Sequence, residues 1–323
     1  MKPTALILTL ILVLTISIPA VSEDVKPLDI VAVNFPAFDF SRVIAGVRAN
    51  VIMLLPPGSE AHSFEPSPKD IIAVQEADLL VYNGGIADFW ISETVASLGA
   101  EAPVVLRMMD SVSLVTEELV EGMEDTADEH EQETEHKEDA PNEANADEEL
   151  DEHVWTSPRN AKLIVSDIAL KLSELDPAGR EYYQARLAAY AIELDALDDA
   201  FRKLVNGAKR KTIVLGDRFP MRYFTMEYGL AYYAAFPGCS AQTEPSARTL
   251  AFLMDKISEE KIPVVFYIEF SSGKSASVIA EETGAKPLLL HSAHNVTLQE
   301  MQNGVSYLSL MRGNLETLRE ALY

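Results

Sequence analysis

The stretch Asp176-Pro177-Ala178-Gly179, followed by R-E-Y-Y-Q-A-R-L-A-A-Y-A-I-E-L-D-A-L-D-D-A-F-R-K-L-V at 180–205, decides the fold of this 323-residue chain. The opening residues are typical of the turn that begins a helix. Apolar side chains then recur every three or four residues, at Tyr183, Leu187, Tyr190, Leu194, Leu197 and Phe201. They form one stripe on a helix of roughly 40 Å at 1.5 Å per residue. A helix of that length can run behind two domains.

Short apolar runs alternate with helical patterns on the N-terminal side of this long helix. We expect strands at 28–34, 50–55, 78–82 and 103–108, and helices at 68–77, 88–98 and 158–175. Such an alternation of strands and helices predicts an α/β fold with a parallel sheet.

The same plan returns on the C-terminal side. We expect strands at 213–215, 232–236, 264–268 and 287–290, and helices at 220–228, 245–258, 274–282 and 298–322. The chain therefore predicts two β/α lobes with parallel-type sheets. Ligands of open parallel sheets bind beyond the carboxyl ends of the strands. Asp217 and His291 each directly follow a predicted strand, so both are placed at a cleft.

Export is predicted by the first 22 residues. Met1 and Lys2 precede an apolar run from about residue 5 to 20, which is the pattern of a secretory signal peptide and too short for a confident membrane span. We expect an N-terminal lobe at 24–157, a helical segment at 158–207 and a C-terminal lobe at 211–323. No other stretch is apolar enough to cross a bilayer, so the mature protein is expected to be soluble, in the periplasm or another extracytoplasmic space.

The single cysteine, Cys239, limits the chemistry of the chain. It excludes an intramolecular disulfide and every cysteine-rich zinc motif. It also lies far from the predicted cleavage site, so no lipid anchor on an N-terminal cysteine is expected.

An acidic segment interrupts the N-terminal lobe shortly before its C-terminal end. Residues 117–152 contain 18 carboxylates and one lysine, and so carry −17 of the formal net charge of −25. This composition predicts a disordered loop over about 118–149. Its two histidines, His130 and His136, belong either to a solvated insertion or to a weak, flexible collector of cations. The strongly acidic balance argues against a nucleic-acid partner.

Two of the six histidines lie in frames of acidic, aromatic and proline residues: E-A-H-S-F-E-P-S-P at 60–68 and D-E-H-V-W-T-S-P-R-N-A at 151–161. Imidazole is the commonest protein ligand for zinc, and its second nitrogen usually needs a nearby acceptor. Glu60 and Glu152 are candidates for that acceptor, although neighbours in sequence often point apart. Together His62 and His153 indicate a metal site.

At this point the chain resembles the zinc and manganese solute-binding proteins of bacterial ABC importers, the cluster A group. The matching segments are P-P-G-S-E-A-H-S-F-E-P-S-P at 56–68, N-G-G at 83–85 with Trp90 downstream, the second histidine frame at 151–161, Y-G-L at 228–230, E-P-S-A at 244–247 and I-A-E-E-T-G-A-K at 279–286. The resemblance covers essentially the whole mature chain. It implies two β/α lobes joined by one long rigid helix, with a metal in the cleft between them. A histidine-rich acidic insertion is also a feature of the zinc-importing members.

The resemblance also implies a set of metal ligands. His62 matches the first family ligand and His153 the second. At the third position the chain departs from the pattern: without a gap Arg218 stands there, and with a one-residue insertion Asp217 does. The fourth position is an aspartate in the family and His291 here. Arginine cannot bind a cation, so the expected set is His62, His153, His291 and Asp217, with the third position open.

Other side chains compete for places in this site. His294 can replace His291, since the segment H-S-A-H at 291–294 offers two imidazoles. Glu269 is either a further ligand, an ion pair with Arg218 or a contact that closes the lobes. A set rich in imidazole nitrogen favours tetrahedral Zn²⁺, whereas Mn²⁺ prefers more oxygen and a higher coordination number.

The resemblance therefore predicts a monomeric protein, not an enzyme, that captures Zn²⁺ and delivers it to an ABC-type permease. A manganese or iron member of the same family is one alternative. A secreted zinc hydrolase is another, because catalytic zinc keeps three protein ligands and an open position. The chain has no His-Glu-x-x-His motif and no Gly-x-Ser-x-Gly motif to support that alternative.

Overall fold

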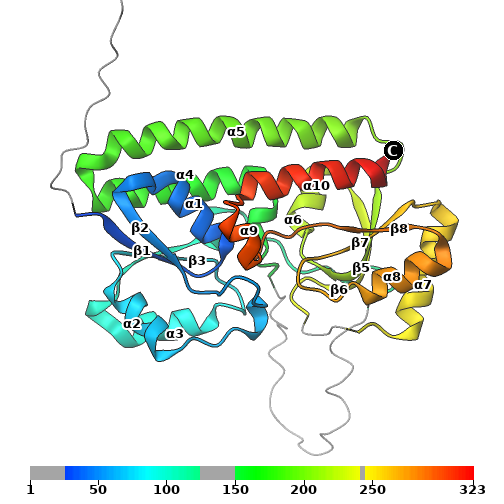
Figure 1. The fold of residues 1–323 in the computed structure, drawn as a ribbon, viewed down its shortest axis with the longest axis horizontal. Helices are drawn as coiled ribbons and strands as arrows, with labels where there is room; N and C mark the ends of the chain where they lie inside the picture. Colours follow the sequence, from blue (N-terminus) through cyan, green and yellow to red (C-terminus); the bar gives the residue numbers. More distant parts are fainter. Residues whose placement is uncertain (1–25, 124–149, 241–243) are drawn as a thin grey trace, which may run out of the picture.

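Two parallel sheets lie at opposite ends of the molecule, and one long helix spans both along a single side (Figure 1). The computed structural model describes residues 26–123, 150–240 and 244–323, except the side chain of His62. The long helix α5 (Arg180–Asn206) has 27 residues. The predicted α/β class with two parallel sheets is confirmed.

The first sheet has the strand order β2-β1-β3-β4, with every pair parallel. Its strands are β1 (Leu28–Ala32), β2 (Ala49–Met53), β3 (Leu79–Tyr82) and β4 (Val104–Arg107). Helices α1 (Phe35–Ala45) and α4 (Pro158–Leu175) cover one face, and α2 (Pro68–Glu76) and α3 (Phe89–Leu98) cover the other. Because helices cover both faces, the strands are almost continuous apolar runs.

The second sheet repeats this arrangement with the order β6-β5-β7-β8, again all parallel. Its strands are β5 (Thr212–Phe219), β6 (Ala231–Pro237), β7 (Val264–Tyr267) and β8 (Lys286–Leu289). Helices α7 (Ala247–Glu260) and α8 (Lys274–Thr283) pack on one face. On the other face lie α6 (Arg222–Tyr228) and α10 (Tyr307–Leu322), and the short α9 (Leu298–Gln302) precedes α10.

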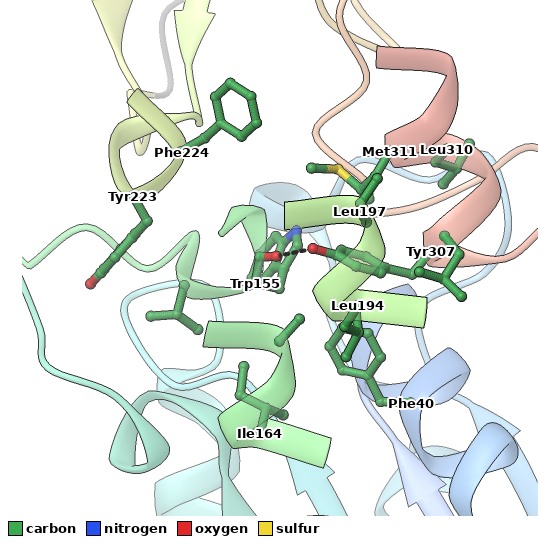
Figure 2. Close-up of a cluster of buried hydrophobic side chains, with 14 of the residues drawn as sticks. Phe40, Trp155, Ile164, Leu194, Leu197, Tyr223, Phe224, Tyr307, Leu310 and Met311 are labelled. Carbon is green, nitrogen blue, oxygen red and sulfur yellow. Dashed lines mark hydrogen bonds between the residues drawn. The ribbon is translucent and has the colours of Figure 1, made fainter. Parts of the chain in front are cut away.

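A single apolar core joins the two lobes beneath α5 (Figure 2). The stripe of α5 supplies Leu194 and Leu197, which are almost fully buried against Phe40 from α1 and Tyr307 from α10. The Tyr307 hydroxyl donates to the carbonyl oxygen of Trp155 at 2.8 Å, which satisfies that hydroxyl inside the core. The lobes are thus packed on one shared helical layer, which fixes the backbone around His153.

The structure differs from the sequence-based expectations at three elements, of which one is an additional helix. Helix α1 was not expected, because eight of its 11 residues are buried and polar residues occur at only three positions, Asp39, Ser41 and Arg42. One helix at 298–322 was expected, but the chain breaks after Gln302 at Gly304, whose φ is 73°. Strand β5 runs on through a bulge between Leu215 and Arg218, so Asp217 lies within the strand and not after it.

The first residues of the predicted acidic loop contact the second lobe. Glu118 forms an ion pair with Arg222 at 2.8 Å and accepts a hydrogen bond from the Tyr232 hydroxyl at 3.2 Å. Thr116 and Leu150 form an isolated antiparallel β-bridge. The rest of that loop, with His130 and His136, lies outside the described residues. Among the helices that the structure describes, none is long and apolar enough to cross a membrane.

Candidate metal centre

A cavity of about 30 Å³ lies between the lobes, at the carboxyl ends of the strands of the second sheet. The first lobe contributes the loop after β2 and His153, and the second contributes the ends of β5, β6 and β7 and the segment after β8. Its polar lining includes Glu60, His153, Arg218, Glu269, Ser292 and His294. Sites for organic ligands occupy about 300–1,000 Å³, so this cavity suits a single ion.

His153 is held rigidly at the wall of the cavity. Its imidazole is 1 % exposed and packs edge-on against Trp155 at 5.6 Å. The Asp151 carboxylate accepts from the His153 amide at 2.8 Å, and the same Oδ1 atom lies 3.3 Å from His153 Nδ1. A carboxylate on one imidazole nitrogen orients the ring and raises the basicity of the other nitrogen, which is the usual support of a metal-binding histidine.

His294 brings the second imidazole into the cavity. Its ring centre lies 5.7 Å from that of His153 at an interplanar angle of 89°, and 4.8 Å from Trp155. The chain turns at Ala293, whose φ of 62° is a left-handed conformation that alanine rarely adopts. The segment is tied to the first lobe, because the side-chain Nδ2 of Asn295 donates to the carbonyl oxygens of Pro56 and Ser59, each at 2.8 Å. His294 is therefore positioned by both lobes.

His291 does not line the cavity. Its Nδ1 accepts a hydrogen bond from the Ala293 amide at 2.9 Å and lies 3.5 Å from the Glu269 carboxylate. Its main chain is held on both sides by Asn314, whose side chain accepts from the His291 amide at 2.8 Å and donates to the His291 carbonyl at 2.7 Å. An Nδ1 that accepts an amide proton has no lone pair left for a metal. Of the two candidate imidazoles in H-S-A-H, the structure brings His294 to the site.

The open third position is occupied by an arginine. The Arg218 guanidinium lines the cavity, 3.3 Å from the Glu60 carboxylate across the cleft and 3.3 Å from the Ser240 carbonyl oxygen. Asp217 is absent from the described lining. Burial raises the pKa of Asp217, and hydrogen bonds involving Ser271, the Arg218 amide and Ile268 act in the opposite direction. Asp217 is therefore engaged within the second lobe and does not point into the cleft.

The three predicted glutamates have different roles. Glu60 lines the cavity and pairs with Arg218. Glu269 accepts hydrogen bonds from the Ser292 amide at 2.7 Å, from the Ser292 hydroxyl and from the His294 amide at 3.3 Å, so it shapes the loop that carries His294. Glu152 is buried and packs against Gly85. A Cβ atom added to Gly85 would lie 2.1 Å from the Glu152 carboxylate. Among the contacts of the described side chains, Glu60 is the one of the three that combines a place in the lining with a partner across the cleft.

The first predicted ligand is located by its backbone alone. His62 is the middle residue of the 3₁₀ turn Ala61–Ser63, and Glu60 and Ala61 beside it line the cavity. The capping box of α2, formed by Ser67 and Asp70, fixes where the chain leaves this loop.

A group that the sequence did not suggest lies beside His153. Ligand atoms of Glu117, His153 and Cys239 all lie within 4.8 Å of one another. Burial raises the pKa of the Glu117 carboxyl, and the nearby charge of Asp151 raises it further. Burial also raises the pKa of the Cys239 thiol. In the sequence Glu117 is the first residue of the acidic segment, and no local pattern connects it to Cys239, which lies 122 positions further along the chain.

The chain matches a family model described as the periplasmic component A of the zinc-uptake complex, over residues 30–321. It is 31 % identical over 295 residues to the high-affinity zinc uptake system protein ZnuA of Bacillus subtilis, covering 91 % of this chain and 88 % of that protein. It is also 31 % identical over 290 residues to the zinc-binding protein AdcA of Streptococcus pyogenes. That match covers 90 % of this chain but only 55 % of AdcA, so the chain spans about half of that relative.

Solved structures of proteins with related sequences have the same fold as this chain. The Zn(II)-bound ZnuA-like domain of AdcA from Streptococcus pneumoniae is similar with a TM-score of 0.73 and 28 % identity, over 92 % of this chain and 99 % of that one. The metal-dependent lipoprotein YcdH of Bacillus subtilis is similar with a TM-score of 0.74 and 29 % identity, over 91 % and 99 %.

Proposed function

The chain belongs to the family of periplasmic zinc-uptake complex component A proteins, and on that premise we propose that it captures Zn²⁺ outside the cytoplasm and delivers it to an ABC-type permease. Members of the family are solute-binding components of transport systems and not enzymes, which removes the reason to assign a hydrolase to this chain.

The observation that carries the proposal is the pair of imidazoles, one from each side of the cleft, on one small cavity. Two imidazoles bound to one tetrahedral zinc, with Zn–N bonds of about 2.0 Å, have ring centres roughly 5 Å apart. His153 and His294 are already 5.7 Å apart and nearly perpendicular. A small closing movement brings both within bonding distance of the same ion.

We assign the remaining ligands from the first lobe. His62 directly follows Glu60 and Ala61, which line the cavity. Of the two carboxylates in the lining, Glu269 is already engaged by the amides of Ser292 and His294, so we assign the carboxylate ligand to Glu60. The proposed set is therefore Glu60, His62, His153 and His294, in place of the expected His291 and Asp217. Three nitrogens and one oxygen suit tetrahedral zinc better than manganese.

Zinc titration in a chelator buffer tests the assignment. His294→Ala should weaken zinc binding by more than about 100-fold, since loss of an outer partner alone costs about 10- to 100-fold. His291→Ala is the matched control, because it removes an imidazole three residues away that does not line the cavity, and it should cost about tenfold or less. If His291→Ala is the damaging change and His294→Ala the mild one, the assignment is wrong.

The permease partner, the monomeric state and the lack of a nucleic-acid partner are part of this proposal. So is the absence of a lipid anchor, which rests on the distance of the single Cys239 from residues 20–24. Some relatives are named lipoproteins. The intact mass of the exported protein decides this point.

A further inference from the structure

The group of Glu117, His153 and Cys239 combines three kinds of metal ligand in one place. Their ligand atoms lie within 4.8 Å of one another, and both His153 and the backbone beside Cys239 border the cleft. In a tetrahedral zinc site with bonds of about 2.0–2.3 Å, ligand atoms lie about 3.3–3.8 Å apart. The group needs to contract by roughly 1 Å to enclose an ion.

The backbone holds these side chains together. The Glu117 carboxylate accepts from the amides of Cys239 at 3.1 Å and Gly238 at 3.4 Å, which fixes the carboxylate beside the thiol. Gly238 lies against the imidazole, since an added Cβ would lie 3.0 Å from His153 Cε1 and 3.1 Å from Nδ1. Any larger residue at 238 would push the loop with Cys239 away from His153. The close approach of the three ligands therefore depends on the chain geometry at Gly238.

A fourth group nearby, the Asp151 carboxylate, has one oxygen without a hydrogen-bond partner among the described residues. Asp151 is fully buried, and its Oδ1 atom is used by His153. Its Oδ2 atom has no hydrogen-bond partner among the residues that the structure describes. A buried carboxylate oxygen without a partner costs free energy, and a bound cation is one way to satisfy it. Asp151 is close enough to affect the ionisation of Glu117 and of Cys239.

We propose that Glu117, His153 and Cys239, supported by Asp151, form a second seat for a divalent cation at the edge of the cleft. A mixed set of thiolate, imidazole and carboxylate selects zinc or the softer cadmium and disfavours magnesium, calcium and manganese. On binding, the thiol releases its proton to solvent and the metal–sulfur bond forms.

This seat competes with the cleft set for His153. A neutral imidazole has one free lone pair, so it binds one cation unless it loses a second proton. The ion therefore occupies either the cleft set or the thiolate set, and the seat is an alternative position of the same ion. This part of the inference rests on the proposed function, because the cleft set is the competitor.

Cobalt(II) is the probe, because a cobalt–thiolate bond gives a charge-transfer absorption that nitrogen and oxygen ligands do not. The mature protein is loaded with one equivalent of Co²⁺, and its spectrum is compared with those of four variants. We expect the absorption in the wild type, its loss in Cys239→Ser and its weakening in Glu117→Gln. It should remain unchanged in Glu118→Gln, the matched control, since Glu118 pairs with Arg222 instead. In His294→Ala it should increase, because the competing set has lost a ligand.

The inference is overturned if neither the wild type nor His294→Ala shows the thiolate absorption. It is also overturned if His294→Ala reduces it, since Cys239 would then belong to the cleft set. If Cys239→Ser does not fold, alkylation of Cys239 in the wild type replaces it: Cd²⁺ should slow the reaction, and an unchanged rate contradicts the seat. A different result would contradict the proposed function: zinc affinity that is unchanged in His294→Ala.

Discussion

The two lobes share one strand order but present different chemistry to the cleft. The first lobe offers His153, locked by Asp151, and a short loop with Glu60. The second offers Arg218 on a bulged strand and His294 after a left-handed turn. The first lobe thus supplies preorganised ligands, while the second supplies one imidazole and one fixed positive charge. Two lobes with one topology can differ at the cleft because strand length and loop conformation are independent of strand order.

Changing His153 should have the largest effect, because this side chain belongs to both proposed sets of ligands. We expect His153→Ala to weaken zinc binding by more than about 100-fold and to abolish cobalt–thiolate absorption. Competitive chelator titration measures the first effect. The variant should keep its far-ultraviolet circular dichroism, which shows that the fold survives. Zinc affinity within tenfold of the wild type would mean that the first lobe does not anchor the ion.

Asp151→Asn tests whether the first lobe is preorganised by its carboxylate. The neutral amide still fits the space but no longer favours a metal on His153, so zinc affinity should fall about 10- to 100-fold. Asp110→Asn is the control, because Asp110 is exposed and pairs only with Arg107 within the described contacts. Equal affinities for the two variants would contradict this role of Asp151.

Arg218→His gives the second lobe another imidazole at the cleft. It removes the positive charge of the guanidinium from the cavity wall, where a unit charge and a divalent ion about 5 Å apart repel by roughly 7 kcal/mol at an effective dielectric constant of 20. The paired Glu60 carboxylate offsets part of this repulsion. We expect zinc affinity to rise by about tenfold or more. Arg218→Gln removes the charge without adding a ligand and should give a smaller gain. A loss of affinity in both variants would show that the Arg218–Glu60 pair is needed to close the cleft.

Asp176→Asn should leave zinc affinity unchanged and lower stability. The Asp176 carboxylate accepts from the Arg48 guanidinium and, at 2.7 Å, from the Tyr183 hydroxyl, and so joins the start of α5 to the first lobe. Loss of a charge-assisted hydrogen bond costs about 1.5–3 kcal/mol. Urea unfolding of the zinc-free protein measures this cost. A change in zinc affinity of more than threefold would show that the anchor of the helix also sets the geometry of the cleft.

The same carboxylate predicts the direction of acid sensitivity. Burial alone would raise the pKa of Asp176, but hydrogen bonds from Tyr183 and Arg48 bring it below the usual value. A carboxyl with a lowered folded-state pKa stabilises the protein above the unfolded pKa of about 3.9 and loses that contribution as pH falls through the folded value. The stability difference between wild type and Asp176→Asn should therefore shrink below about pH 4.

The periodic features of the fold could be predicted from the sequence, whereas conformations set by packing could not. The stripe from Tyr183 to Phe201 predicted α5, and the alternation of short apolar runs predicted both sheets. Helix α1 was missed because eight of its 11 residues are buried and its three polar residues, Asp39, Ser41 and Arg42, are too few to mark a solvent-facing side.

The metal site, like the fold, could be predicted from the sequence only in part. The two histidine frames indicated His153, but the choice between His291 and His294 depends on the backbone at Ala293, where the sequence gives no glycine to signal a positive φ. Glu117 and Cys239 are distant in the chain and meet only through the loop at Gly238. Such contacts between distant residues are not visible in one sequence.

The central claim is that one zinc ion is bound between the lobes by His153 and His294. An anomalous difference map of zinc-loaded crystals tests it most directly, because the map locates the ion and its ligands together. We expect one strong peak in the cleft, about 2.0 Å from a nitrogen of each imidazole and bonded also to His62 and Glu60. A peak bonded to His291 or Asp217, or a zinc ion outside the cleft with His294 unbound, would contradict it.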